Sequence, residues 1–115
     1  MIQVFVYGTL RGTGRKATLA GFSKDDTAQF PTIYPDPGHR VEGEVITVSH
    51  VELAQMDHYE GFHPERPERS LYVRMETADG SYVYVANVEQ HDAWDVSYEM
   101  DEVEEQLAEC AVVLE

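Results

Sequence analysis

The sequence predicts an α+β fold: a small mixed, mostly antiparallel β-barrel with one or two flanking helices. Three observations support this class. About six short stretches are rich in β-branched and aromatic residues, two longer stretches have helical spacing, and turn residues separate neighbouring strands closely enough for hairpins. The 115 residues, of which 43% are hydrophobic, suit one compact domain over residues 1–115.

Four strands are predicted in the first half of the chain. Their apolar and β-branched runs cover residues 2–6, 17–23, 28–34 and 41–48. Gly8 ends the first strand, and the polar, glycine-rich R-G-T-G-R-K at residues 11–16 predicts a loop. Pro31 places the third strand at an edge or a bulge, because proline cannot donate a hydrogen bond to the sheet. The composition P-D-P-G-H at residues 35–39 predicts a turn.

A helix of about three turns is predicted over residues 49–59. Ser49 fits the N-cap position, and Glu52 three residues later completes a capping box. Gly61 supplies the left-handed residue that commonly ends a helix.

The last third of the chain predicts a hairpin and a second helix. Two alternating runs at residues 71–77 and 82–88 flank A-D-G-S, and an Asp-Gly pair between such runs is a strong hairpin signal. Residues 97–110 form an acidic pattern with helical spacing. Its apolar face consists of Val103, Leu107 and Cys110.

Acidic residues dominate the composition, with 22 Asp plus Glu against 8 Lys plus Arg and a formal net charge of −14. Such a surface repels phosphate backbones, so we expect no nucleic-acid partner. Lysine is scarce, with only Lys16 and Lys24. Excess carboxylate with little lysine is the pattern of a halophilic protein that stays soluble in high salt, and an ordinary acidic protein is the alternative.

The composition also bounds the location and the cofactors. No run of about 18 apolar residues and no secretory pattern is present, so we expect a cytoplasmic protein without a membrane partner. The single cysteine, Cys110, excludes an intramolecular disulfide and a four-cysteine metal site. The histidines lack the spacing of metal ligands, and we expect no metal and no cofactor.

Two segments carry candidate chemistry: Y-G-T-L-R, which leaves the first strand, and M-D-H-Y-E-G, which closes the first helix. Together with V-E-G-E-V before that helix and L-Y-V-R after it, these segments occur in the order found in gamma-glutamylcyclotransferase-like proteins, including the AIG2-like and gamma-glutamylamine cyclotransferase branches. The chain resembles this family from residue 4 to about residue 88.

The resemblance implies a mixed barrel with a pocket at its mouth and an enzyme that cyclises a gamma-glutamyl group to 5-oxoproline. In this family the first loop holds the gamma-glutamyl group through its backbone amides. Here that loop would be Tyr7, Gly8, Thr9 and Leu10. Glu60 would act as general acid and base, with a pKa raised by partial burial beside Tyr59 and near Asp57. Tyr72 and Arg74 match the family's Y-x-R, with a structural or pocket-lining role.

Other interpretations of these residues stay open at this stage. Glu60 could instead be a solvated surface acid that precedes a helix-ending glycine. Tyr7 could pack under its loop without touching substrate. Asp57 could be a second catalytic acid or, as we favour, a structural hydrogen-bond acceptor.

The segment after Arg11 departs from the family pattern. Family members continue into an Asn-His pair and a short helix, whereas this chain has only G-T-G-R-K before the next strand. This shortening predicts a more open pocket. It also keeps a second hypothesis open, a catalytically inactive relative that binds a small carboxylate or a protein partner through the same pocket. The leaving amine and the oligomeric state are not predicted.

Overall fold

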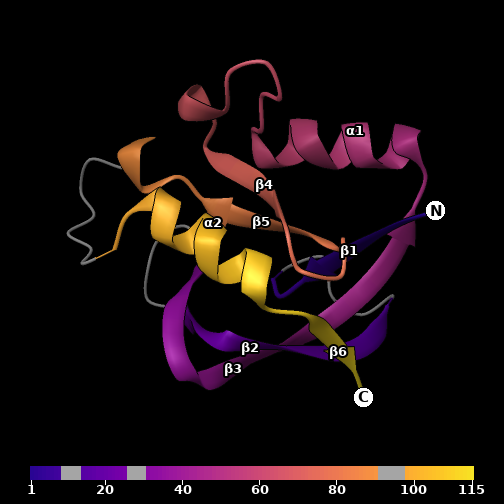
Figure 1. Cartoon of the computed structure of the whole chain (residues 1–115). Helices are drawn as coiled ribbons and strands as arrows, with labels where there is room; N and C mark the ends of the chain where they lie inside the picture. The colour runs from indigo at the N-terminus through magenta and orange to yellow at the C-terminus, as the bar shows by residue number, and fades with distance from the viewer. Residues whose placement is uncertain (9–13, 26–30, 91–97) are drawn as a thin grey trace.

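A six-stranded sheet forms the centre of the protein (Figure 1). The computed structural model describes residues 1–8, 14–25, 31–90 and 98–115. The strands are β1 (Ile2–Val6), β2 (Arg15–Asp25), β3 (Thr32–Val48), β4 (Tyr72–Glu76), β5 (Tyr82–Ala86) and β6 (Val112–Leu114). The helices are α1 (His50–Glu60) and α2 (Met100–Glu109), with 3₁₀ turns at Pro67–Arg69 and Val88–Gln90. These elements confirm the α+β class.

The sheet is mixed and mostly antiparallel, as predicted. Its strand order is β4-β5-β1-β3-β2-β6, and β1 and β5 form the one parallel pair in the described part of the chain. Since β1 lies between β5 and β3, the chain leaves β1 in the middle of the sheet. The segment that follows β1 therefore starts from a rigid, doubly paired strand.

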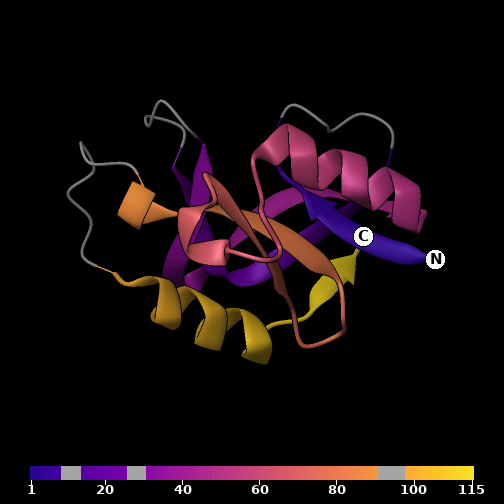
Figure 2. The same ribbon diagram turned by 90° about the horizontal axis from the view of Figure 1, so that it is seen from above.

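The two faces of the sheet are covered by different helices, which lie on opposite sides in Figure 2. Successive side chains of a strand point to opposite faces. Phe5 of β1 accordingly packs in the core that also contains Val103 and Leu107 of α2. Val4 and Val6 pack in the second core, with Leu53 of α1. Both cores depend on β1.

The sheet does not close into a barrel, so this part of the fold prediction is wrong. The described strands end in two separate edges, β4 and β6. At one end the edges come together, because Ala78 N donates to Cys110 O at 2.9 Å and Val112 N donates to Asp79 Oδ1 at 3.2 Å. Elsewhere α2 packs against β4 and β3 and buries Val103 and Leu107 completely. The edge strands β4 and β6 therefore do not pair with each other.

The turn predicted at residues 35–39 is also wrong, because these residues lie inside the long strand β3. Phe22 pairs with Pro35 and Ala20 pairs with Arg40, so four residues of β3 lie opposite Gly21 alone. The result is a wide bulge, with positive φ angles of 87° at Gly21 and 90° at Gly38. The glycines and prolines of this segment therefore mark a bulge. Pairing between β2 and β3 continues on both sides of it. Pro31 lies just before β3.

Other local predictions are confirmed. Ser49 and Glu52 form the capping box of α1, with Glu52 N donating to Ser49 Oγ at 3.1 Å and Ser49 N donating to Glu52 Oε1 at 3.0 Å. Gly61 ends α1 in the left-handed conformation. The predicted hairpin is β4 with β5, and the acidic helix is α2. The sequence analysis missed β6, which pairs with β2.

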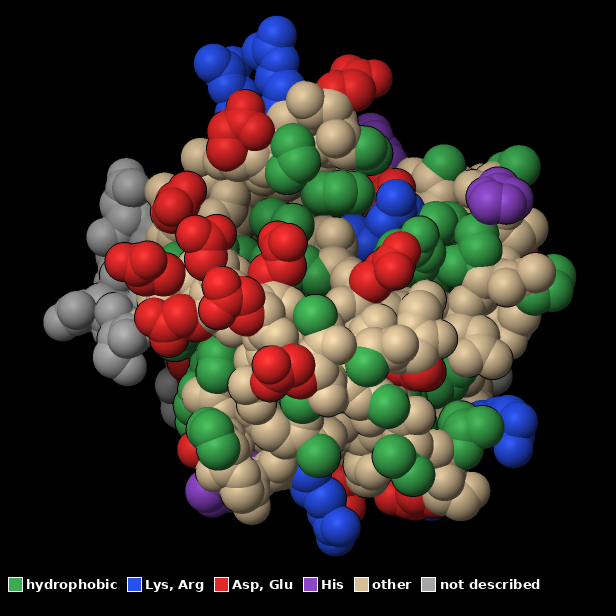
Figure 3. All heavy atoms as spheres, in the orientation of Figure 1, with side chains coloured by type: hydrophobic (Ala, Val, Ile, Leu, Met, Phe, Trp, Pro, Cys, Tyr) green, Lys and Arg blue, Asp and Glu red, His purple; other side chains and the backbone are tan. Residues whose placement is uncertain are grey.

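Exposed carboxylates gather over α2 (Figure 3). The exposed acids of this helix and its N-cap are Glu99, Asp101, Glu102, Glu104, Glu105 and Glu109. Within the parts of the chain described, no helix has the length and apolar character needed to cross a membrane.

Added salt is expected to stabilise this protein. The Debye length falls from about 10 Å at 0.1 M to about 3 Å at 1 M, which weakens repulsion among the exposed carboxylates. We therefore expect the melting temperature to rise steadily when KCl is raised from 0.1 M to molar concentration, as followed by circular dichroism. A melting temperature that stays constant or falls over this range would contradict the halophilic interpretation.

Candidate active site

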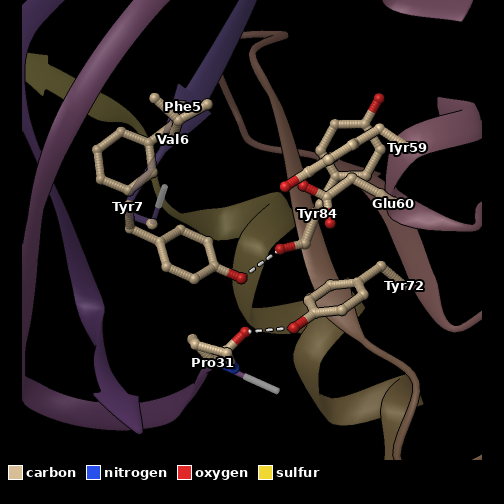
Figure 4. Close-up of a pocket in the computed structure, with 9 residues that line it drawn as sticks. Phe5, Val6, Tyr7, Pro31, Tyr59, Glu60, Tyr72 and Tyr84 are labelled. Carbon is tan, nitrogen blue, oxygen red and sulfur yellow. Dashed lines mark hydrogen bonds between the residues drawn. The ribbon is translucent and has the colours of Figure 1, made fainter. Parts of the chain in front are cut away.

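A cavity of about 220 Å³ lies between the exit of β1 and the C-terminal end of α1. It is lined by Phe5, Val6, Tyr7, Gly8, Pro31, Tyr59, Glu60, Tyr72 and Tyr84. Figure 4 shows Phe5 and Tyr7 on one side of this hollow and Glu60 on the other. The cavity is thus mostly aromatic, with one carboxylate among its described lining residues.

Glu60 is the last residue of α1 and lines the cavity while half-buried. Its position depends on the helix stop, because Gly61 turns the chain immediately after it. Burial raises the pKa of the Glu60 carboxyl above its ordinary value, since a partly desolvated carboxylate is harder to ionise. The direction agrees with the sequence prediction. The expected contribution from Asp57 is not found, and burial alone is the cause.

Gly8 lines the cavity immediately after β1. Its φ angle lies outside the left-handed region, and a Cβ built on it would meet no atom within 4 Å among the described residues. The backbone conformation at Gly8 therefore does not itself require a glycine. Thr9 and Leu10, the other two predicted binding residues of this loop, lie outside the described residues.

Three tyrosines surround Glu60 in the cavity. The hydroxyl of Tyr7 donates to the backbone oxygen of Tyr84, and the hydroxyl of Tyr72 donates to Pro31 O at 2.8 Å (Figure 4). Burial, with a smaller effect of the Glu60 charge, raises the pKa of Tyr7 and raises that of Tyr72 to about 12. Burial and the hydrogen bond to Asp57 likewise raise the pKa of Tyr84. All three hydroxyls are consequently neutral at physiological pH.

Arg74 lies behind the cavity wall and is not among the lining residues. One guanidinium nitrogen, Nη1, donates to both carboxylate oxygens of Asp57, at 3.0 and 2.8 Å. The guanidinium also lies 5.2 Å from the ring centre of Phe62 and 4.7 Å from that of Tyr82. The geometry supports the structural one of the two roles considered for Arg74. Asp57 accepts these hydrogen bonds, which agrees with the structural role favoured from the sequence.

One family model matches most of the chain. Residues 4–102 match the family model described as gamma-glutamyl cyclotransferase, AIG2-like. The chain belongs to this family. The search of curated proteins and the search of solved structures gave no match.

The AIG2-like match covers both halves of the cavity. Gly8 and Glu60, which are far apart in the sequence, lie within the matched residues and line one hollow. The family supports gamma-glutamyl cyclotransferase activity in general, on small gamma-glutamyl substrates.

Several residues of the candidate site were not predicted from the sequence. Phe5, Val6, Pro31 and Tyr84 line the cavity without having been singled out, and Tyr59 was considered only as a neighbour of Glu60. A signal existed for Tyr84, because the hairpin register pairs it with Arg74. That register follows from the Asp-Gly turn. Pro31 could not be found in this way, because no local sequence pattern places it beside the cavity that it lines.

Proposed function

We propose that the protein cyclises the gamma-glutamyl group of an amine or a peptide to 5-oxoproline and releases the amine, with Glu60 as general acid and base. The observation that supports this most directly is that Glu60 and Gly8 line one cavity, where burial raises the pKa of Glu60. A volume of about 220 Å³ suits a group the size of an amino acid. Drug-sized ligands usually need pockets of about 300–1,000 Å³.

The reaction needs no nucleophile from the protein. The α-amine of the substrate attacks its own γ-carbonyl carbon, so that a new C–N bond closes the lactam ring. The bond from that carbon to the leaving nitrogen then breaks. Holding the substrate bent supplies much of the acceleration, since well-oriented intramolecular attack is worth about 7–11 kcal/mol in favourable cases. The aromatic walls formed by Phe5, Tyr7 and Tyr72 would restrict the substrate to this bent shape.

Glu60 would carry the proton in both directions. As a carboxylate it takes a proton from the α-nitrogen, which must lose one before or during the attack. As a carboxylic acid it returns that proton to the leaving nitrogen, so the net reaction leaves Glu60 unchanged. A raised pKa suits this role, because both protonation states then become accessible nearer to neutral pH. Backbone amides at Gly8 and beyond would stabilise the charge that develops on the γ-carbonyl oxygen.

The pH dependence of kcat/KM is expected to reveal the ionisation of Glu60. Activity should be lost as the pH falls through the pKa of Glu60, because only the ionised form accepts a proton. Since burial raises that pKa, the acidic limb should lie above the value of an ordinary glutamate. The measurement is a kcat/KM profile between pH 4 and pH 9. A profile that is flat down to pH 4 would contradict the role of Glu60.

The activity itself is tested with purified protein and a panel of gamma-glutamyl alkylamides and gamma-glutamyl dipeptides. 5-Oxoproline and the released amine are measured at 0.1 M and at molar KCl, so that any salt requirement is met. Equal amounts of the two products are expected for at least one substrate. A folded protein that releases no 5-oxoproline from any of them would overturn the proposal in favour of a binding protein.

A further inference from the structure

We infer that Asp57, Arg74 and Tyr84 form a positioning network, which holds the Glu60 end of α1 against the β4–β5 hairpin and fixes its separation from Gly8. The network is defined by these three side chains. Its consequence for turnover rests on the proposed function, whereas its effect on Glu60 can be measured without turnover. None of the three side chains is needed to carry the transferred proton.

Asp57 is the centre of the network. Its carboxylate accepts two hydrogen bonds from Arg74, at 3.0 and 2.8 Å, and one from the Tyr84 hydroxyl at 2.6 Å. Its backbone oxygen accepts from Phe62 N at 2.8 Å, directly after the helix stop. The side chain of Asp57 is 11% exposed and that of Arg74 is 18% exposed. Charge-assisted hydrogen bonds at this burial hold their geometry more firmly than surface pairs do.

Glu60 lies three residues after Asp57 on α1, a spacing that places both on neighbouring positions of the helix surface. The helix has few other anchors, because Leu53 and Asp57 are its two buried residues. Its end is held to β4 and β5 through the Asp57 side chain, and just beyond it Leu71 N donates to Gly61 O at 3.0 Å. Loosening Asp57 would release the helix turn that carries Glu60.

Tyr84 connects this anchor to the other half of the cavity. Its hydroxyl donates to Asp57, while its backbone oxygen accepts from the hydroxyl of Tyr7, the residue before Gly8. Tyr84 is 5% exposed and Tyr7 is 7% exposed, so neither side chain has room to swing away. One strand position of β5 therefore sets the distance between the two halves of the proposed site.

The network also determines the charge that surrounds Glu60. The tyrosines that line the cavity with Glu60 from the sheet side are Tyr7 just after β1, Tyr72 of β4 and Tyr84 of β5, and all are neutral below about pH 9 because their pKa values are raised. Asp57 and the exposed His58 precede Glu60 on α1, and Arg74 pairs with Asp57. Asp57 and Arg74 compensate each other, so Glu60 faces a pair without net charge.

The test uses four variants of the network, one control variant and two main measurements, the pKa of Glu60 and the steady-state kinetics. Asp57→Asn and Arg74→Gln each change the net charge of the pair, the double variant removes both charges, and Tyr84→Phe removes only the hydroxyl. Tyr82→Phe is the matched control. Tyr82 lies on the same strand, and its hydroxyl has no hydrogen-bond partner among the described residues. The pKa of Glu60 is followed by ¹³C NMR of labelled glutamate carboxyls, assigned with Glu60→Gln. In parallel, kcat and KM are measured for a gamma-glutamyl substrate, and circular dichroism identifies the folded variants.

The expected result has a signature that simple loosening does not produce. Arg74→Gln leaves the Asp57 carboxylate uncompensated and should raise the pKa of Glu60, whereas Asp57→Asn leaves the guanidinium and should lower it. The double variant should lie between them. Tyr84→Phe should lower kcat by about 10-fold or more with KM little changed, because misplacing a reacting group by about 1 Å is worth up to about 100-fold. Tyr82→Phe should change neither parameter by more than about two-fold.

Two outcomes would overturn the inference. One is a Glu60 pKa that shifts in the same direction, or not at all, in the two single-charge variants. The other is an active enzyme in which Tyr84→Phe and Tyr82→Phe have the same kcat. If the parent protein shows no turnover, the proposed function fails, and the NMR titration alone still decides whether the network controls Glu60. If one single-charge variant does not fold, the other still decides, and a Glu60 pKa that fails to shift in its expected direction would overturn the inference. If neither folds, Tyr84→Phe keeps both charges, and a kcat equal to that of Tyr82→Phe would overturn it.

Discussion

Replacing Glu60 with Gln is expected to lower kcat for 5-oxoproline formation by about 10²–10⁴-fold, the range that one general acid–base group supplies. Glutamine has nearly the same shape and still lines the cavity, but it can neither take the proton from the α-nitrogen nor return one to the leaving nitrogen. KM should change little, because the aromatic walls and the loop after β1 remain. The measurement is a steady-state comparison of kcat and KM with the parent protein.

A matched control separates the loss of chemistry from the loss of a charge. Glu102→Gln removes one carboxylate from the exposed face of α2 and is expected to leave kcat within about two-fold. Stability gives a second check. Burial raises the pKa of Glu60 in the folded state, so its contribution to stability is complete below the unfolded pKa and is lost as the pH rises through the folded pKa. Glu60→Gln should therefore be at least as stable as the parent at pH 7. A kcat close to the parent's in this variant would exclude the mechanism.

Much of the fold could be predicted because its signals are local. The capping box of Ser49 and Glu52, the helix stop at Gly61 and the Asp-Gly hairpin each depend on residues close together in the sequence. The errors arise where tertiary contacts decide. Pairing with β2 continues on both sides of the bulge in β3, and the three residues of β6 are too few to show alternation.

The site was predicted only in part for the same reason. The two halves of the cavity could be named because each belongs to a motif of the family. The connection between them could not, because Tyr84 contacts Tyr7 and Asp57 across 77 and 27 residues of sequence. The barrel prediction failed because the edges β4 and β6 stay separate while α2 packs against β4 and β3, and no pattern within a strand reveals that a helix will pack there.

The glycine of the V-E-G-E-V motif is explained by the structure, and replacing it has the largest expected effect on stability. Gly43 is on β3, the strand next to β1 in the sheet. A Cβ at this position would collide with the backbone oxygen of Val6 and come within 2.8 Å of the Phe5 ring. Glycine inside a strand usually lowers stability by roughly 0.5–1 kcal/mol relative to alanine, so propensity alone favours the substitution. Overpacking a buried contact costs about 1–3 kcal/mol or more, and here it opposes a backbone atom that cannot rotate away. The cost of the clash is therefore expected to exceed the gain in strand propensity.

Gly43→Ala should lower the free energy of unfolding by about 1–3 kcal/mol, as measured by urea denaturation. It should also raise KM, because the displaced ring of Phe5 lines the cavity. Gly8→Ala is the matched control for stability, since its Cβ would meet no atom within 4 Å among the described residues, and its free energy of unfolding should stay within about 0.5 kcal/mol of the parent's. A Gly43→Ala variant as stable as Gly8→Ala would mean that β1 and β3 are not packed this closely. Because β1 carries Phe5, Val6 and the approach to Gly8, that result would also remove the rigid wall on which the proposed site depends.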